Sequence, residues 1–214
     1  RTGTLLLADV VDNDSWRVIE GESYIDKQLY RDGASLNAVE QQYKHVAQLT
    51  QQFGIPWQVV VLWRGSDKDD LEPFHEAIRS YMRRPYADAS VNTFEMTCSA
   101  HREPVRAYQE LSVLAQRNSD MVIIAYVGRS NGLGPTLAAN TTVPVITVPA
   151  SAKDFPHDVW SSLRLPSEAP CMTILEPKNA VLAALQILAM RNPRMYAVLR
   201  MQQEERHMNV MGLP

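Results

Sequence analysis

The segment Met121-Val-Ile-Ile-Ala-Tyr-Val127, followed directly by Gly128-Arg-Ser-Asn-Gly-Leu-Gly-Pro135, decides the fold. Its first half is apolar almost throughout, which is typical of a parallel-sheet strand that helices cover on both faces. Its second half holds glycines, a proline and small polar residues, which favour a turn and then a short helix. The segment therefore predicts a buried strand that delivers a polar loop to one edge of a sheet.

Further apolar runs repeat this arrangement along the chain. They predict short strands over 58–63, 91–97, 143–148 and 172–175. Apolar residues at helical spacing predict helices over 69–84, after residue 101, over 177–191 and from Pro193 onward. Strands that alternate with helices over short connections indicate an α/β fold. We expect a three-layer, flavodoxin-like parallel sheet flanked by helices, preceded by a short fragment of a second domain.

The N-terminal part follows a different pattern. Residues 4–11 predict a short buried strand, and the apolar spacing from Ser35 to about residue 52 predicts a helix. Gly54 and Pro56 interrupt that helix. We therefore place a domain boundary near residue 55, with one segment over 1–55 and the main domain over 56–214.

Composition narrows the classes of function. The 214 residues carry a formal net charge of −3, so no basic surface is available to attract nucleic acid. No apolar run approaches the roughly 20 residues of a membrane span. Cys98 and Cys171 are too few for a disulfide framework, and we expect reduced thiols in an intracellular protein. The five histidines show no helical metal-ligand spacing, so we expect no metal in the main domain.

Polar residues follow the first three predicted strands of the main domain. These strands end in Gly65-Ser66, Ser99-Ala100-His101 and Gly128-Arg129-Ser130-Asn131. In parallel sheets the carboxyl ends of the strands meet at one edge, where ligands bind. The sequence therefore predicts a ligand site at this edge.

The residue types at this edge indicate phosphate binding and proton transfer. Glycine and serine before a helix offer free N–H groups to a phosphate, and Arg129 can hold one by two parallel bonds. His101 has an imidazole side chain, which can accept and donate a proton near neutral pH. From the residues alone a bland interpretation stays open, because glycines at such turns commonly serve backbone geometry and a single histidine is more often packed or solvated than catalytic.

Three motifs make the main domain recognisable. Ser99-Ala-His-Arg102, Gly128 to Pro135, and Asp158-Val-Trp-Ser-Ser-Leu-Arg-Leu-Pro-Ser167 resemble the phosphoribosylaminoimidazole (AIR) carboxylase family from about residue 57 to about residue 200. The loop 128–135 is similar to the class II form of animals, which uses CO2 directly.

The resemblance implies roles for individual residues. It implies that His101 carries the proton at C4 of the aminoimidazole and that the CO2 pocket is formed by Ser130, Asn131 and Gly132. It implies that the phosphoribosyl substrate is held by Ser66, Asp69, Ser99, Arg102 and Arg129. It also implies a homo-octamer in the cytoplasm, with Trp160 to Pro166 and the last helix as candidate subunit contacts, and no cofactor besides the substrates, the ribotide and CO2.

The first 50 residues resemble a different enzyme. Residues 7–17 and 26–32 are similar to the C-terminal part of SAICAR synthetase, which animals fuse ahead of the carboxylase. Asp9 resembles a position near the metal-nucleotide, and Lys27 and Arg31 resemble substrate-side positions. ATP and Mg²⁺ would concern only this incomplete synthetase part, from which we expect no synthetase activity.

Two departures from the family pattern keep alternatives open. Lys68 stands where the first loop usually has a small hydroxyl, and Arg102 stands where class II animal enzymes typically have lysine. One alternative is the class I mutase, which moves a carboxyl group from N5 to C4 of the same ribotide. Another is a non-catalytic scaffold domain that binds purine intermediates.

Overall fold

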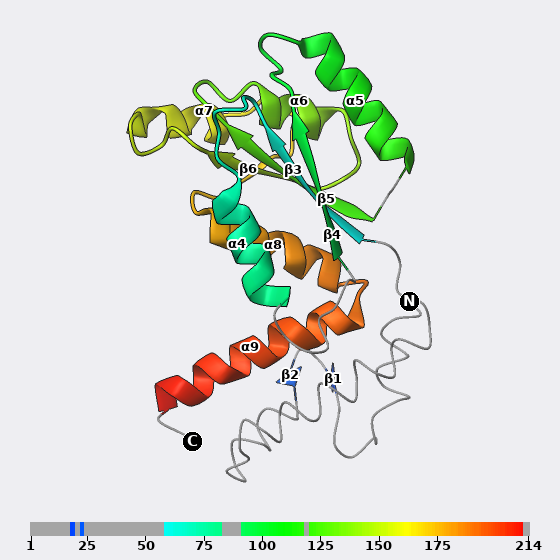
Figure 1. The fold of residues 1–214 in the computed structure, drawn as a ribbon, viewed down its shortest axis with the longest axis vertical. Helices are drawn as coiled ribbons and strands as arrows, with labels where there is room; N and C mark the ends of the chain where they lie inside the picture. Colours follow the sequence, from blue (N-terminus) through cyan, green and yellow to red (C-terminus); the bar gives the residue numbers. More distant parts are fainter. Residues whose placement is uncertain (1–17, 20–21, 24–57, 83–90, 118–119, 212–214) are drawn as a thin grey trace. The chain divides into compact units, whose positions relative to one another are not determined.

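The computed structural model describes residues 18–19, 22–23, 58–82, 91–117 and 120–211 (Figure 1). Within the N-terminal segment it places two short antiparallel strands, β1 (Val18–Ile19) and β2 (Glu22–Ser23). The strand predicted over 4–11, the helix predicted from Ser35, the boundary near residue 55 and the synthetase-like positions Asp9, Lys27 and Arg31 lie outside the described residues.

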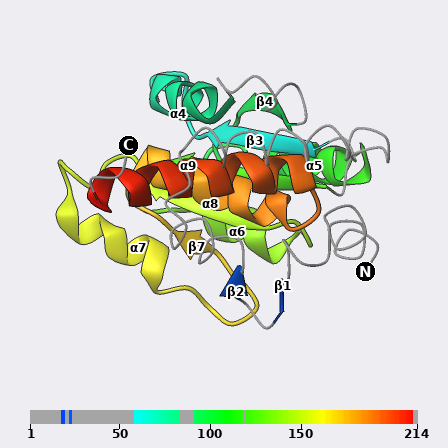
Figure 2. The same ribbon diagram turned by 90° about the horizontal axis from the view of Figure 1, so that it is seen from below.

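A five-stranded parallel sheet forms the centre of the main domain. Its strands are β3 (Gln58–Arg64), β4 (Val91–Thr97), β5 (Met121–Val127), β6 (Val145–Pro149) and β7 (Met172–Thr173). They lie in the order β4-β3-β5-β6-β7, and every ladder is parallel. Seen from below, β4 and β7 lie toward opposite edges (Figure 2). This order is the flavodoxin-like one, so the predicted fold class is confirmed.

Helices cover both faces of the sheet. Figure 1 shows α5 (Pro104–Arg117) and α6 (Leu133–Ala139) on one face, and α4 (Glu72–Met82) and α8 (Pro177–Ala189) on the other. The short helices η1 (Pro156–Val159) and α7 (Trp160–Leu163) lie between β6 and β7 in the chain. The helix α9 (Pro193–Met211) belongs to a second compact unit, made of residues 1–56, 81–90 and 189–214.

The core explains why the deciding segment is apolar. Ile123 and Ala125 of β5 are fully buried in one cluster with Leu111 of α5 and Leu137 of α6. On the opposite face, the ring of Tyr126 packs edge-on against Phe74 of α4, with ring centroids 5.0 Å apart. A strand packed on both faces has no solvent side, so alternation of polar and apolar residues is absent. No helix in the described part of the chain is long and apolar enough to cross a membrane.

Element boundaries differ from the prediction at the first loop of the domain. The helix expected from about residue 69 begins at Glu72, because residues 65–70 form a loop that is held by side-chain hydrogen bonds. The Arg64 guanidinium donates to the carbonyl of Asp69 at 2.9 Å, and the Asp70 carboxylate accepts the N–H of Glu72 at 2.9 Å. Asp70 thereby satisfies one of the free N–H groups at the start of the helix.

Helix α6 approaches β6 so closely that it tolerates only glycine at one position. A methyl group built on Gly134 would lie 2.2 Å from the Thr147 hydroxyl oxygen. Thr147 is fully buried, so neither side can give way easily. Gly134→Ala should therefore lower the free energy of unfolding by about 1–3 kcal/mol, measured by urea titration. Gly128→Ala is the matched control, since nothing lies within 4 Å of its added methyl group; equal stability of the two variants would contradict this packing.

Candidate functional site

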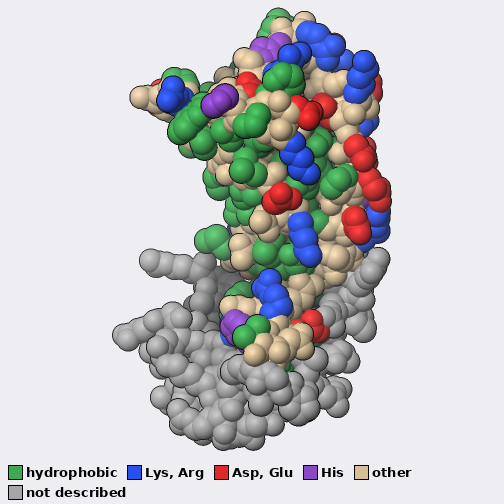
Figure 3. Space-filling model, turned by 90° about the vertical axis from the view of Figure 1, so that its left-hand side faces the viewer, with side chains coloured by type: hydrophobic (Ala, Val, Ile, Leu, Met, Phe, Trp, Pro, Cys, Tyr) green, Lys and Arg blue, Asp and Glu red, His purple; other side chains and the backbone are tan. Residues whose placement is uncertain are grey.

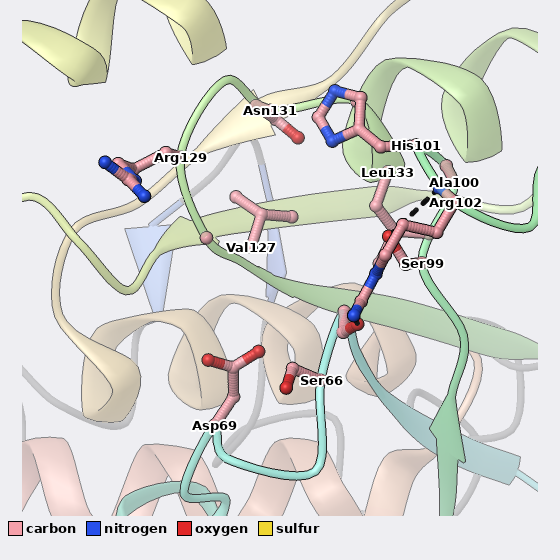
Figure 4. Close-up of a pocket in the computed structure, with 13 residues that line it drawn as sticks. Ser66, Asp69, Ser99, Ala100, His101, Arg102, Val127, Arg129, Asn131 and Leu133 are labelled. Atoms are coloured by element: carbon pink, nitrogen blue, oxygen red, sulfur yellow. Dashed lines mark hydrogen bonds between the residues drawn. The ribbon is translucent and has the colours of Figure 1, made fainter.

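A pocket of about 180 Å³ lies where β3, β4 and β5 end (Figure 4). Its lining comes from three loops and consists of Gly65, Ser66, Asp69, Ser99, Ala100, His101, Arg102, Val127, Gly128, Arg129, Asn131, Gly132 and Leu133. The three strand ends that the sequence placed together thus meet at one edge. Of the residues predicted for the site, Ser130 is the one that does not line the pocket.

The first loop is shaped by Arg64, the last residue of β3. Its Nε donates to the Thr97 hydroxyl at 2.9 Å, and its Nη1 donates to the carbonyl of Asp69 at 2.9 Å. Arg64 therefore ties the end of β4 to the first loop. Sequence reasoning missed this residue; the available signal was a single arginine directly after the apolar residues 59–63 of the strand.

Asp69 is the acidic group of the pocket. Burial raises the pKa of its carboxyl above the ordinary value of 3.8, while a backbone hydrogen bond from Ser66 and the charges of Arg64 and Arg102 act in the opposite direction. Figure 4 shows Asp69 and Ser66 side by side on the same wall. Lys68, in contrast, has an exposed side chain outside the pocket lining, and its backbone N–H donates to the Ser66 hydroxyl at 3.3 Å.

The second loop is fixed by Ser99 and Arg102. The Ser99 carbonyl accepts the N–H groups of Arg102 at 3.2 Å and Glu103 at 2.7 Å, just ahead of α5. The Arg102 guanidinium reaches across to the first loop and donates to the carbonyl of Gly65 at 3.1 Å. This contact joins the loops that follow β3 and β4.

His101 lies directly against the third loop. A methyl group built on Gly132 would lie 2.5 Å from Nε2 of His101 and 2.8 Å from both ring carbons beside it. Only glycine at position 132 lets the imidazole occupy this place. Figure 4 shows the ring at the mouth of the pocket next to Asn131, and the His101 side chain is exposed.

The third loop is held from outside the pocket by the segment around α7. The N–H of Ser130 donates to both carboxylate oxygens of Asp158 at 3.0 Å, and the N–H of Asn131 donates to the Ser161 hydroxyl at 3.1 Å. The Asn131 side chain is buried; its Nδ2 donates to Ser162 at 3.0 Å, and its Oδ1 accepts the N–H of Gly134 at 2.9 Å. The motif that begins at Asp158 therefore supports the loop, a role that sequence analysis did not assign.

Arg129 lies on the other side of the third loop from His101 (Figure 4). Its guanidinium stacks over the Phe155 ring, 4.9 Å from the ring centroid. This contact restrains a long side chain and leaves the N–H groups at the edge of the guanidinium plane for an anion.

The described residues contain no group of three or more histidine, cysteine or acidic side chains placed to hold a metal ion. Both cysteines are free thiols. Burial raises the pKa of the Cys98 and Cys171 thiols, which favours the neutral, unreactive form.

A flavodoxin-like domain with a pocket at the carboxyl ends of its strands is typical of proteins that bind small molecules there. The histidine in this pocket adds a group that can transfer protons. The family model described as AIR carboxylase matches residues 58–209. The chain belongs to the AIR carboxylase family.

Curated relatives extend this similarity over almost the whole chain. The chain is 33% identical to a probable multifunctional protein ADE2 of Caenorhabditis elegans, over 97% of this chain and 50% of the relative. It is 34% identical to the human bifunctional phosphoribosylaminoimidazole carboxylase/phosphoribosylaminoimidazole succinocarboxamide synthetase, over 93% of this chain and 48% of the relative. The chain thus spans about half the length of these relatives.

A solved structure shares the fold. The crystal structure of Treponema denticola PurE superposes with a TM-score of 0.62 at 23% identity, and the match covers 72% of this chain and 95% of that chain. This likeness agrees with the flavodoxin-like sheet described above.

The raised pKa of Asp69 predicts a pH-dependent stability. The folded chain holds the proton of the Asp69 carboxyl more tightly than the unfolded chain does. The contribution of this protonated carboxyl to stability is therefore fully present below pH 3.8, and it is lost as pH rises through the raised pKa. Asp69→Asn should therefore gain stability relative to the parent chain as pH rises through that window, measured by urea titration at several pH values. The exposed Asp154→Asn is the control for the change in charge; a stability difference for Asp69→Asn that does not vary with pH would contradict the prediction.

Proposed function

We propose that this chain adds CO2 to C4 of 5-aminoimidazole ribonucleotide, with His101 accepting the proton that C4 loses. The observation that carries the proposal is the position of the His101 imidazole, which lies against Gly132 in a pocket built from three strand ends. Family membership and the printed names of the animal relatives support it.

The chemistry needs few protein groups. The ring amino group makes C4 nucleophilic, so C4 attacks the carbon of CO2 and an electron pair moves onto oxygen. C4 then carries both a hydrogen and a carboxylate, and transfer of that proton to His101 restores the aromatic ring. The same imidazole returns the proton in the reverse reaction. No ATP and no organic cofactor takes part in these steps.

The third loop supplies the donor for the developing carboxylate. The N–H groups of Ser130 and Asn131 already donate to Asp158 and Ser161. In the described part of the chain, the N–H of Gly132 has no acceptor, and Gly132 is the residue that touches His101. We therefore assign CO2 to the space beside Gly132, with Ser130 and Asn131 shaping the loop.

The remaining polar groups suit the phosphoribosyl end of the substrate. Ser66 and Asp69 can accept hydrogen bonds from ribose hydroxyls, and Ser99 belongs to the same lining. Arg102 and Arg129 supply fixed cations for the phosphate. Arg102 is also the residue that favours the mutase alternative, since class I enzymes share it.

Assembly, location and fusion belong to the same proposal. We infer a cytoplasmic homo-octamer, and a bifunctional protein in which SAICAR synthetase precedes this domain and alone uses ATP and Mg²⁺. Three large hydrophobic side chains on and beside α7 are about half exposed, which suits subunit contacts. They are Phe155 (47% exposed), Trp160 (49%) and Leu163 (53%). α7 lies on the left-hand side of Figure 1, and hydrophobic side chains gather on this side in Figure 3.

His101→Asn tests the proton carrier. The amide matches the imidazole in shape but can neither accept the C4 proton nor return it, so decarboxylation of the C4-carboxylated ribotide, in which C4 must gain a proton, should slow by at least about 100-fold. CO2 release reports the rate, and an unchanged circular dichroism spectrum shows that the fold is intact. Turnover close to that of the parent chain would remove His101 from the mechanism.

Gly132→Ala tests the contact between the loop and the imidazole. The added methyl group must push the exposed His101 ring aside, which should lower turnover by about 100-fold. Stability should change little, because the ring is free to swing into solvent. The measurement pairs the same decarboxylation assay with urea titration; full activity would show that the ring position in this structure is not the working one.

A further inference from the structure

The segment 151–162 carries two acidic residues, and the one that holds the third loop, Asp158, lies outside the pocket lining. We propose that Asp158 is a positioning residue for carboxylation: it fixes the Ser130 backbone so that Gly132 is presented to His101. The inference deepens the proposed function and rests on it.

Asp158 is well placed to hold the loop. Both of its carboxylate oxygens lie 3.0 Å from the backbone nitrogen of Ser130, and the Ser151 hydroxyl donates to one of them at 3.5 Å. A charged acceptor on a backbone N–H makes a stronger bond than a neutral one. The two ends of this contact are 28 residues apart in the chain, so it fastens the loop to a separate element.

The loop needs such support because Ser130 has an unfavourable backbone conformation. Its φ of 56° lies in the left-handed region, where residues with a side chain are disfavoured. A serine there persists only if the surroundings fix it. Asp158 meets this need at the strained residue itself, two positions before Gly132.

Ser161 extends the same support by one residue. Its hydroxyl donates to the carbonyl of Asp158 at 2.7 Å and accepts the N–H of Asn131 at 3.1 Å. The backbone carbonyl of residue 158 therefore orients the hydroxyl that holds Asn131, while the Asp158 carboxylate holds Ser130. The N–H groups of Ser130 and Asn131 are thus occupied. Of the three N–H groups of residues 130–132 in the described structure, the one left for the substrate is that of Gly132.

The nearby Asp154 provides a matched control. It lies in the same segment and carries the same charge, but its side chain is exposed and makes no hydrogen bond or ion pair in the described structure. If the loss of one negative charge alone lowered kcat, substitution of Asp154 and of Asp158 would lower it equally. The proposed role predicts a fall in kcat for Asp158 alone.

The experiment compares Asp158→Ala, Asp158→Asn and Asp154→Ala in the full chain, with CO2 or bicarbonate as carbon source. Because Ser66, Asp69 and Arg102 lie in loops that Asp158 does not contact, most of the ribose and phosphate end keeps its shape, and Arg129 is the one assigned phosphate ligand beside Ser130. Asp158→Ala should therefore lower kcat by about 100-fold, while KM for the ribotide stays within about threefold. Asp158→Asn keeps one acceptor oxygen for Ser130 and should recover much of the lost kcat. Asp154→Ala should match the parent chain.

The outcomes separate the two proposals. An inactive parent chain that still binds the ribotide would refute the carboxylase function itself. An active parent chain with an equally active Asp158→Ala variant would refute only the role of Asp158. Should Asp158→Ala fail to fold, Asp158→Asn decides: a fall in kcat of at least about threefold, larger than any change in KM, supports the role, and kinetics equal to those of the parent chain overturn it.

Discussion

The contact between the His101 imidazole and the backbone of Gly132 is the constraint on which the site depends. It brings the loop after β4 and the loop after β5 to van der Waals distance, and it leaves no room for a side chain at position 132. β5 can deliver its loop to that place only because both of its faces are buried, which fixes the strand in the middle of the sheet. The burial of β5 therefore determines both the central position of this strand in the sheet and the position of the loop that contacts His101.

Each of the three loops is held by a group that does not itself react. Arg64 fixes the first loop, Ser99 and Arg102 fix the second, and Asp158 with Ser161 fixes the third. This arrangement places the groups that fix the first and third loops, Arg64, Asp158 and Ser161, outside the pocket lining, whereas Ser99 and Arg102 also line the pocket. It also explains a buried asparagine at position 131, whose amide is bonded within the protein on both its oxygen and its nitrogen.

Sequence reasoning reached the sheet and the position of the pocket because both follow from local patterns. Apolar runs such as 121–127 identify buried strands, and polar residues after them identify the ligand edge. It did not reach Arg64 or Asp158, since their roles depend on contacts between distant segments, 28 residues apart in the case of Asp158 and Ser130.

Two residues that stood out in the sequence have side chains whose direction the sequence did not predict. Asn131 lines the pocket, yet its side chain is used inside the protein. Lys68, which stood out in sequence as a replacement for a ligand-binding hydroxyl, has its side chain in solvent. Only its backbone takes part in the loop, through the Ser66 hydroxyl, and its side chain does not line the pocket. Side-chain direction at a loop position has no periodic signal in sequence, which is why neither outcome was predictable.

The carbon source tests the central claim most directly. The chain is supplied with 5-aminoimidazole ribonucleotide and isotopically labelled bicarbonate without ATP, and the product is analysed for label at the C4 carboxyl group. Direct carboxylation predicts labelled product that accumulates with enzyme concentration. Conversion of the N5-carboxylated ribotide alone, with no label entering from bicarbonate, would contradict it and identify the mutase reaction instead.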